Sequence, residues 1–583
     1  MVMKTIRKDL FTKPQEPIRP KNIFEREAFK QSVQTASGNG SLKYKTTGNI
    51  FVDDFAKLGN YLAPRDINEV YADMEKLWAT DALTTLKEEG YVRGITRQPV
   101  FNGKKLDTLR AQGLKSEAKF RLAWIAENHP STYKKNLAIF VAEGSWKDLF
   151  DVLEILLSYN GVEVATKLPA WNYTINFIIE GLADKEQNNL IKKYLPTIRA
   201  TKNLSLHRQC STFIGRAIAQ KLFPNINKVS AYKKYRLLKA SGTAHEWEQV
   251  ISRQQFDKLP SMFDKIAGRA LSALTKNRIK TWDGKRADGT SWLSRHNLEQ
   301  AYTQWLSKQP VAKFTGFAFE LFKPLCGGRS YDAYQNYNRL AAYQLNTINK
   351  QFAELLKKGK TTNNKSNFIV ALDSSGSMTS EAKGTGMSAW HVGLSMGLYF
   401  SELLTGKFAH TILEFDDTCE VRTFKGKTYT DKFTSFAPGD WGSTNFLSVA
   451  KLFAQLKQKG YPESEFPTGV LAISDGEFNR TTSNTTNFDT FLNILRRAGF
   501  SEEFVSNFTI VLWDIPNGYY SRGVRPKFES LADEGNFFYM SGFDGAAITF
   551  LTTGDKKMKS IPKTPEELFN AAMNQELLNK LKV

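Results

Sequence analysis

Cysteine is scarce in this chain of 583 residues. Cys210, Cys326 and Cys419 stand far apart, and they give neither a zinc-binding spacing nor an even set for disulfide bonds. No apolar run reaches the roughly 18 residues of a membrane span, and the N-terminal residues lack the apolar core of a signal peptide. These absences exclude a disulfide-stapled secreted domain. They predict a soluble, cytoplasmic protein without a membrane partner.

Signatures of catalysis are also missing. The chain has no G-x-x-x-x-G-K-[ST] phosphate loop, no H-E-x-x-H zinc motif, no G-x-S-x-G elbow and no paired Cys/His motif. A nuclease that uses two metal ions would need several clustered carboxylates, and no such cluster is evident. We therefore expect a protein that is not an enzyme.

Positive charge is abundant but unevenly distributed. The formal net charge is +21. Residues 1–366 hold 59 Lys and Arg against 34 Asp and Glu, a balance of +25, whereas residues 367–583 hold 21 against 25, a balance of −4. Residues 199–329 alone hold 24 against 8, a balance of +16. Such a density indicates a polyanion partner, with an alkaline surface tuned for solubility as the alternative.

The chain is too long for one hydrophobic core, so several domains are expected. Composition and apolar periodicity divide it into five parts. We predict an extended basic arm over 1–50, an α-helical domain over 51–356, a polar linker over 357–366, an α/β domain over 367–555, and a C-terminal helical tail over 556–583.

Residues 51–356 show apolar residues at three- and four-residue spacing, in amphipathic segments separated by short Gly, Pro, Asn or Ser turns. No strand-like alternation is evident between these segments. Successive amphipathic helices of this kind commonly stack as an α-solenoid. We therefore predict an all-α, HEAT-like repeat array, with an irregular helical array as the alternative.

After the linker, short apolar runs alternate with helical segments. The runs are NFIVALD, HTILEF, GVLAIS, FTIVLW and NFFYM. Buried strands that alternate with helices predict a doubly wound, Rossmann-like parallel sheet covered on both faces.

Oxygen-bearing side chains follow the predicted strands at the edge where such sheets bind ligands. NFIVALD leads into Asp373, Ser375 and Ser377, a later loop offers Thr444, and GVLAIS leads into Asp475. Two carboxylates and three hydroxyls predict a site for Mg²⁺, with Mn²⁺ as the alternative. The competing interpretation makes Ser377 a helix cap and Asp373 a turn residue. Asp416 and Asp417 follow HTILEF and are interpreted as structural rather than as ligands.

Residues 367–555 resemble the von Willebrand factor A domain with its metal-ion-dependent adhesion site. The D-x-S-x-S string, the later threonine and the second aspartate carry the resemblance. By matching position, it implies that the cation ligands are Asp373, Ser375, Ser377, Thr444 and Asp475. It also implies a free coordination position for an acidic group of a protein partner.

Two helical stretches carry a second resemblance. Residues 129–156 contain a G-x-W-K-D-L turn, and residues 230–271 contain a basic Y-R-x-L helix followed by a Lys-Leu-Pro-Ser turn. Both are similar to helical proteins with a C-terminal von Willebrand A domain that are related to the Ro autoantigen family, whose module is called TROVE. The resemblance covers about residues 51–555. It implies a ring of helices closed by the A domain, and a ribonucleoprotein that binds small structured RNA or single-stranded RNA ends.

Candidate RNA contacts lie in three basic stretches between residues 205 and 286. Tyr232, Tyr235 and Trp282 stand among these cations, where they would either stack on unpaired bases or belong to the core. His207 is interpreted as structural. The predicted RNA-binding residues are Arg208, Arg216, Lys221, Lys233, Lys234, Arg236, Lys239, Lys276, Arg278 and Lys280.

A second class of function remains open from the sequence. The chain could be a non-enzymatic scaffold or assembly protein, for example in a virus particle, whose metal site captures an acidic residue of a partner. Recovery of nucleic acid with the purified protein would distinguish the two classes.

Overall fold

The computed structural model describes residues 23–36, 39–57, 65–184, 187–199, 204–242, 245–277, 290–314, 316–326, 339–360, 367–382, 385–437, 441–476, 478–481, 485–515, 528, 530–541 and 562–583. The chain forms two compact units. One unit, the helical unit, includes Pro64–Arg253 and Ala572–Val583. The other, the sheet unit, comprises Arg19–Ala63 and Gln254–Ala571.

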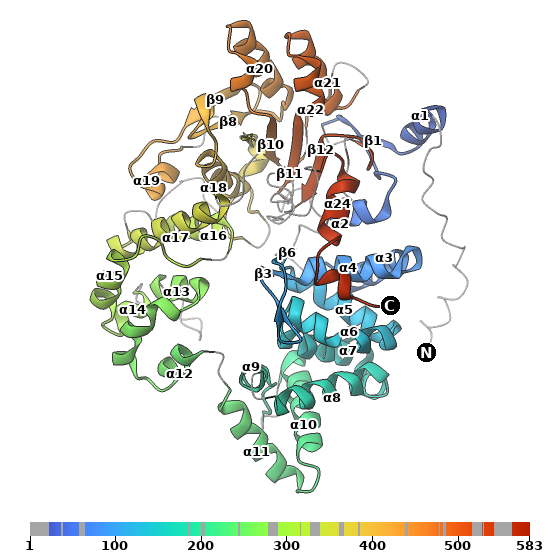
Figure 1. The fold of residues 1–583 in the computed structure, drawn as a ribbon, viewed down its shortest axis with the longest axis vertical. Helices are drawn as coiled ribbons and strands as arrows, with labels where there is room; N and C mark the ends of the chain where they lie inside the picture. Colours follow the sequence, from blue (N-terminus) through green and yellow to red (C-terminus); the bar gives the residue numbers. More distant parts are fainter. Residues whose placement is uncertain are drawn as a thin grey trace. The chain divides into compact units, whose positions relative to one another are not determined.

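Helices dominate the helical unit (Figure 1). Successive helices pack against one another, as the amphipathic pattern predicts. No helix in the described ranges is long and apolar enough to cross a membrane. The helices are α3 (Ile67–Thr80), α4 (Ala82–Arg93), α5 (Lys115–Asn128), α6 (Pro130–Glu143), α7 (Trp146–Ala165), α8 (Pro169–Ala183), α9 (Asn188–Tyr194), α10 (Leu206–Leu222), α11 (Lys228–Ala240) and α12 (Glu246–Ser252).

Side chains at the N-terminal ends of several helices cap the free backbone N–H groups of the first turn. Asp81 begins α4 by accepting hydrogen bonds from the backbone N–H groups of Leu83 and Thr84, at 2.9 and 3.1 Å. Ser145 and Asp148 form a capping box at the start of α7. The turn between α6 and α7 is the G-x-W-K-D-L stretch noted in the sequence, and Asp148 is its capping carboxylate.

The prediction of an all-α domain over 51–356 is wrong between α4 and α5. There β3 (Ile95–Arg97) pairs with β6 (Leu109–Gln112), and β4 (Val100–Phe101) pairs with β5 (Lys104–Lys105), both antiparallel. Asn102 and Gly103 connect β4 to β5 with φ of 50° and 72°. An Asn-Gly pair with positive φ at both positions is the preferred two-residue hairpin turn. This pair in the sequence therefore indicates the hairpin that the apolar pattern did not predict.

The C-terminal residues 572–583 belong to the helical unit. The buried amide of Asn136 donates to the Lys582 carbonyl at 2.6 Å and accepts from the Lys582 N–H at 3.0 Å. Gln575 makes the same two-way contact with the backbone of Arg110, at 2.8 Å in each direction. These paired bonds hold the end of the chain as an extra layer on the helices.

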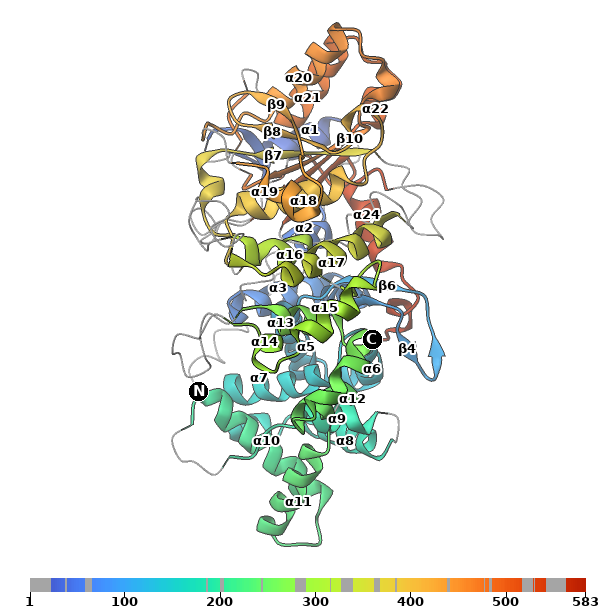
Figure 2. The same ribbon diagram turned by 90° about the vertical axis from the view of Figure 1, so that its left-hand side faces the viewer.

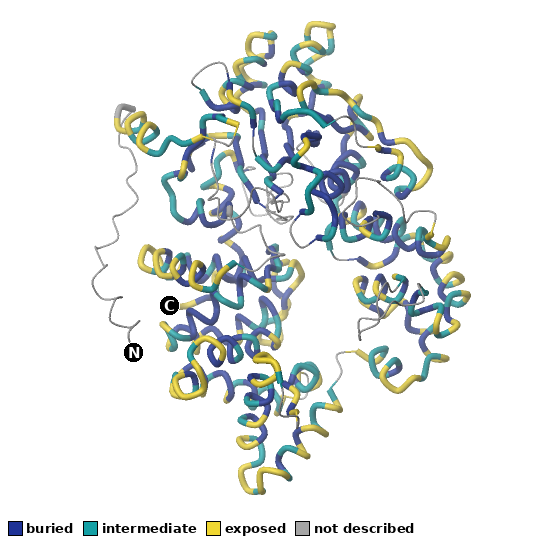
Figure 3. Tube along the Cα trace, turned by 180° about the vertical axis from the view of Figure 1, so that it is seen from behind, coloured by how far each residue is buried: buried dark blue, intermediate teal, exposed yellow. Residues whose placement is uncertain are grey.

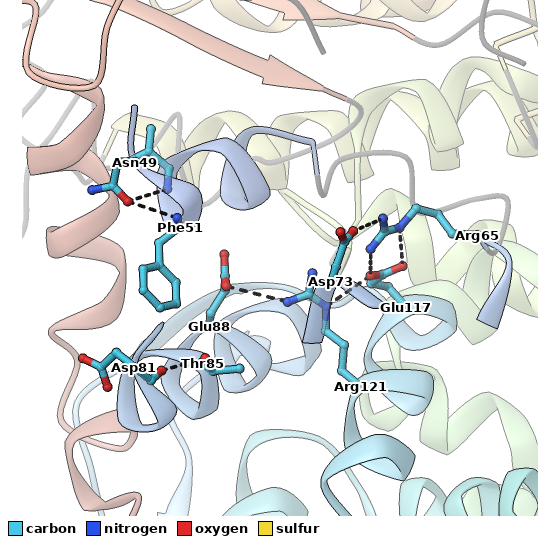
Figure 4. A network of polar contacts seen from close by, with 10 residues as sticks. Asn49, Phe51, Arg65, Asp73, Asp81, Thr85, Glu88, Glu117 and Arg121 are labelled. Carbon is cyan, nitrogen blue, oxygen red and sulfur yellow. Dashed lines mark hydrogen bonds and ion pairs between the residues drawn. The ribbon is translucent and has the colours of Figure 1, made fainter. Parts of the chain in front are cut away.

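A network of ion pairs is buried in the helical unit (Figure 4). Arg121 is fully buried and lies 3.1 Å from Glu117 and 3.7 Å from Glu88. Arg65 pairs with the same Glu117 at 2.6 Å. Buried charges of this kind are tolerated only when they are paired, so the network fixes the packing of α4 on α5.

Two further buried carboxylates lie near this network. Glu89 and Glu143 are both 0% exposed, and no residue in the described part of the chain donates a hydrogen bond to either. Burial, opposed by the charge of Arg93, raises the pKa of Glu89 to about 8. Burial, followed by the charge of Glu89, raises the pKa of Glu143 well above its usual range. Both groups therefore favour the protonated form in the folded protein.

This pKa shift predicts a loss of stability with rising pH. A carboxyl group whose pKa is raised in the folded protein binds its proton more tightly there than in the unfolded chain. This preference stabilises the fold fully at pH values below the ordinary pKa of the group, and the stabilisation is lost as pH rises through about 8. The expected loss between pH 5 and pH 9 is roughly 2–4 kcal/mol. Glu89→Gln should flatten the pH dependence of the melting temperature. The exposed Glu69→Gln should leave it unchanged, and an equal slope in all three proteins would contradict the assignment.

A six-stranded mixed sheet organises the sheet unit, in the order β12-β11-β10-β7-β8-β9. The five apolar runs seen in the sequence form β7 (Phe368–Asp373), β8 (Thr411–Phe415), β10 (Gly469–Ser474), β11 (Thr509–Asp514) and β12 (Phe537–Ser541), which are mutually parallel. This confirms the predicted α/β sheet. The edge strand β9 (Cys419–Thr423) is antiparallel to β8, so the prediction of a purely parallel sheet is wrong.

Helices cover both faces of this sheet (Figure 2). On one face, α20 (Leu447–Gln458) and α21 (Asn487–Arg497) pack on alternate strand residues such as Ile369, Val470 and Ile510. On the other face lies α18 (Ala389–Ser401). A Cβ at Gly393 of α18 would come within 2.4 Å of the Leu372 side chain, so this glycine allows the helix to approach the sheet. The central strands β7, β8 and β10 are accordingly buried along their whole length (Figure 3).

The sheet unit reaches further towards the N-terminus than the predicted boundary at 357–366. It includes α13 (Gly268–Thr275), α14 (Trp292–Arg295), α15 (Glu299–Ser307), α16 (Ala318–Phe322) and α17 (Ala342–Lys360). Phe322 of α16 stacks on Phe433 with ring centroids 4.4 Å apart, and Phe352 of α17 lies 4.8 Å from Tyr429. These aromatic contacts join the helices to α19 (Tyr429–Thr434), beside the sheet.

The described part of the predicted extended arm has regular structure. It forms α1 (Ile23–Ser32), the antiparallel strands β1 (Gln34–Ala36) and β2 (Leu42–Tyr44), and the start of α2 (Ile50–Lys57). Ser41, Lys43, Tyr44 and Thr47 are buried in the sheet unit. These four residues are therefore packed inside the sheet unit, although the composition of the segment suggests an exposed arm.

Candidate metal and nucleic-acid sites

The loop after β7 carries the first three predicted cation ligands. Asp373 ends β7 and is completely buried. Its carboxylate accepts hydrogen bonds from the Ser375 N–H at 2.8 Å and from the Ser474 hydroxyl at 2.5 Å. The hydroxyl oxygens of Ser375 and Ser377 are 3.1 Å apart. The structure thus brings these three oxygen-bearing side chains into one turn.

The loop that carries Thr444 runs beside this turn. Gly442 pairs with Ser375 in a parallel bridge, which places residues 442–444 next to the Asp373 loop. Thr444 is buried, and its carbonyl accepts a hydrogen bond from the Asn479 N–H at 2.9 Å. The threonine is therefore held between the loops that follow β7 and β10.

Asp475 follows β10, the parallel neighbour of β7. Gly476 comes next with φ of 79°, a left-handed conformation in which glycine lets the loop turn away from the sheet edge. Burial and, after it, the negative charge of Asp475 together raise the pKa of Asp373 to about 7, against the hydrogen bonds from Ser474 and Ser375. The two carboxylates are therefore close enough to repel each other.

The donor set fits a hard divalent cation. It contains only oxygen: Asp373, Ser375 and Ser377 lie at the carboxyl end of β7, Asp475 lies at that of β10, and the Thr444 hydroxyl comes from the loop before α20. A cation would relieve the repulsion between Asp373 and Asp475. Within the described ranges, no group of three or more His, Cys, Asp or Glu side chains could hold a metal ion, so a cation at this edge would need hydroxyl ligands as well.

Several residues that support this edge were not singled out from the sequence. Ser474 orients the Asp373 carboxylate, and Asn479 donates to the Ser443 hydroxyl at 2.9 Å. Asp416 accepts from the Thr418 N–H at 2.9 Å, and Asp417 accepts from Ser443. Both aspartates thus have local hydrogen-bond partners at the neighbouring loops, which is a structural role.

Six predicted RNA-binding cations on α10 and α11 are exposed. The two helices pack against each other (Figure 1). Among the described residues, none of the six takes part in an ion pair, which leaves their charges available to a partner. We call these residues the α10–α11 surface: Arg208, Arg216, Lys221, Lys233, Lys234 and Arg236.

The aromatic residues of this surface are already engaged. Tyr235 is completely buried, and its hydroxyl donates to the Pro196 carbonyl at 2.8 Å. The guanidinium of Arg216 lies 5.8 Å from the ring centroid of Tyr232. Lys234 lies 5.7 Å from the ring of Phe223 in the same way. Tyr235 is therefore a core residue rather than a stacking platform for bases.

Two other residues of the basic stretches have structural partners. The Lys239 ammonium donates to the carbonyl of Leu195 at the C-terminal end of α9, and burial lowers the pKa of this lysine. His207 pairs with Glu154 of α7. Lys239 thus caps a helix, and His207 has the structural role expected of it.

The third basic stretch belongs to a different unit from α10 and α11. Lys276 follows α13, is exposed, and belongs to the sheet unit. Arg278, Lys280 and Trp282 lie outside the described residues.

Comparisons with known proteins found matches among family models and among solved structures. A model described as "Domain of unknown function (DUF7788)" matches residues 367–580, and one described as "Domain of unknown function (DUF2828)" matches residues 37–174. No curated protein matches the chain. The chain is similar to the crystal structure of the Deinococcus radiodurans RO (RSR) protein, with 13% identity and a TM-score of 0.35, over 79% of this chain and 87% of that one.

Proposed function

We propose that this protein binds RNA through the α10–α11 surface and binds a divalent cation, Mg²⁺ or Mn²⁺, at the edge of its sheet. The observation that carries the RNA assignment is the set of six exposed cations without ion-pair partners in the described part of the chain. Residues 187–245 contain no Asp or Glu at all, so no acidic side chain within this stretch offsets their charge. Unpaired cations at this density suit phosphate groups.

The available side chains favour recognition of the RNA backbone. Flexible Lys and Arg side chains contact phosphates, whereas sequence-tolerant stacking would need exposed aromatic faces. Tyr235 is in the core, and Arg216 and Lys234 lie over the rings of Tyr232 and Phe223. We therefore expect binding of structured RNA with weak sequence preference. The Ro resemblance also implies binding of single-stranded RNA ends and a ring of helices. Both stay predictions.

In the sheet unit, we propose that Asp373, Ser375, Ser377, Thr444 and Asp475 hold the cation in a von Willebrand A-like site. The cation would supply an electrophilic coordination position for a carboxylate of a protein partner. Ser474 would keep the Asp373 carboxylate oriented, and the Asn479 contacts would fix the threonine loop. Nothing in the described ranges favours a scaffold role in place of RNA binding.

Metal and RNA are expected to act independently. Residues 1–366 carry a balance of +25 and residues 367–583 a balance of −4, so the cation site lies where phosphates are least attracted. EDTA should leave the affinity for a structured RNA within about twofold, as measured by fluorescence anisotropy at fixed ionic strength. Release of the RNA by EDTA, with recovery on adding Mg²⁺, would place the nucleic acid on the metal and reopen the nuclease hypothesis.

A further inference from the structure

The six-stranded sheet ends in β9, and β8 is the one partner of this strand among the described strands (Figure 1). The Asp416 N–H donates to the Thr418 carbonyl at 2.9 Å, and the Phe424 N–H donates to the His410 carbonyl at 3.0 Å. These two bonds enclose the paired segment. Because an antiparallel ladder alternates between residues that bond to the neighbouring strand and residues that point away from it, they fix the orientation of β9. The backbone groups that point away from β8 belong to Cys419, Val421 and Thr423.

This outer edge of β9 is available for pairing. In the described part of the chain, no group forms a hydrogen bond with the outward N–H and C=O groups of these three residues. The Val421 side chain is 42% exposed, and Glu420 and Thr423 are exposed as well. The available stretch ends before Lys425, whose N–H donates to the Ser435 hydroxyl at 3.2 Å. Unpaired groups along a strand edge are a template for pairing with another chain.

The charges on β9 indicate which chain fits. Glu420 is exposed, and no cation of the described ranges forms an ion pair with it. The residue directly opposite on β8 is Glu414, and like charges that face each other across a ladder are unfavourable. Arg422 lies two residues further along β9, on the same face as Glu420. Its guanidinium contacts Glu414 and lies 4.9 Å from the ring centroid of Phe436, so the cation is held at the strand.

We propose that β9 pairs antiparallel with β9 of a second copy of this chain, with Val421 opposite its own equivalent at a two-fold axis. In this register Glu420 of each copy faces Arg422 of the other. These two residues form a non-hydrogen-bonded pair, in which side chains approach most closely. The second copy thus supplies the cation that Glu420 lacks. The outward groups of the two strands would form about six backbone hydrogen bonds and join both sheets into one.

The short strand limits the strength of this contact. Five residues from each copy bury far less surface than the roughly 1,200 Å² of a stable interface, so the dimer should be weak. We expect a dissociation constant on the order of 10–100 µM. In sedimentation velocity on the full chain, freed of nucleic acid, the mean mass should rise from monomer towards dimer between about 1 and 300 µM protein. The contact is independent of the proposed RNA and cation sites.

Two substitutions should prevent the pairing without harming the monomer. The Val421 N–H points away from β8, so Val421→Pro removes no bond of the sheet but removes the central donor of the dimer. Glu420→Arg sets two cations against each other in both intermolecular pairs, and in the monomer it relieves the facing of Glu414 and Glu420. Each variant should weaken dimerisation at least about tenfold.

Glu503→Arg is the matched control for the charge reversal. Glu503 is exposed on α22 (Glu502–Asn507), in the same unit but away from β9, and its substitution makes the same change in net charge. The dimerisation constant of this variant should stay within about twofold of wild type.

Cross-linking tests the register of the two strands. In the proposed pairing the two Cα atoms at position 421 are about 5.5 Å apart, a separation that a disulfide can bridge. Val421→Cys should therefore give a covalent dimer under mild oxidation. Lys427→Cys, at an exposed position beyond the end of β9, should not.

Three results would overturn the proposal. The first is a wild-type chain that stays monomeric at about 300 µM, which would leave the edge to a strand of a different protein. The second is a dimer that Val421→Pro and Glu420→Arg leave unchanged, because its interface would then lie elsewhere. The third is equal cross-linking through Val421→Cys and Lys427→Cys, which would show collision rather than pairing in this register.

Discussion

Loss of divalent-cation binding is the expected result of Asp373→Asn. The substitution removes one of the two carboxylates from a site whose other ligands are hydroxyls and Asp475, and it keeps an oxygen that can accept from the Ser375 N–H. We expect the affinity for Mg²⁺ or Mn²⁺ to fall on the order of 100-fold in calorimetry. The fold should persist, because the substitution also relieves the repulsion between Asp373 and Asp475.

Asp417→Asn is the matched control for this variant. Asp417 lies at the same sheet edge, is exposed, and accepts a hydrogen bond from Ser443 outside the proposed ligand set. Its substitution removes the same charge, so the affinity should change no more than about twofold if only long-range electrostatics are involved. Equal losses in both variants would show that the edge attracts cations without a defined site. Unchanged affinity in Asp373→Asn would refute the site.

The sequence predicted the sheet edge because its signals are local. Phe368–Asp373 and Gly469–Ser474 are buried along their whole length, so they appear as unbroken apolar runs, and the residues after them necessarily meet at one edge. β9 has no such run. Its sequence CEVRT is mostly exposed on an edge strand, so apolar periodicity could not reveal it.

Other features depend on contacts between distant residues, which no local pattern encodes. Lys43 stands in a polar stretch that resembles a solvated arm, and only its hydrogen bond to the Gly476 carbonyl shows that its side chain is buried. The Lys-Glu-Glu run of α4 looks like an exposed helix face, yet Glu88 and Glu89 are buried. Arg121 from the next helix pairs with Glu88, so a tertiary contact helps to decide which side of α4 is inside.

The cations of α11 illustrate the limit of a charge count. The sequence treats Lys233, Lys234, Arg236 and Lys239 as equivalent, but Lys239 is bound to the carbonyl of Leu195. These four cations differ in exposure according to their position around α11, because the side of the helix that holds Tyr235 faces the core. Structure thus narrows the candidate RNA contacts to side chains that are exposed and unpaired within the described part of the chain.

Weakened RNA binding is the expected result of replacing Lys233, Lys234 and Arg236 together with Ala. All three side chains are exposed on α11. Among the described residues, the contact of Lys234 with the Phe223 ring is the one structural contact that the triple substitution would remove. Removing up to three cations that neutralise phosphates should lower the affinity roughly 10- to 100-fold near physiological salt. Sequence preference should stay unchanged, because these cations would bind the RNA backbone.

The matched control removes the same net charge elsewhere in the helical unit. Lys104, Lys105 and Lys134 are exposed, and Lys104→Ala/Lys105→Ala/Lys134→Ala should leave RNA affinity within about threefold. If both triple variants lost affinity equally, RNA would respond to the net charge of the protein rather than to the α10–α11 surface.

RNA affinity of the full chain as a function of salt concentration tests the central claim most directly. For the wild-type protein, the logarithm of the association constant should fall linearly with the logarithm of salt concentration. In the Lys233/Lys234/Arg236 variant the slope should be shallower by about one for each phosphate group that the variant no longer neutralises, up to about three. Equal slopes for wild type and variant, or the absence of RNA binding at low salt, would contradict the account.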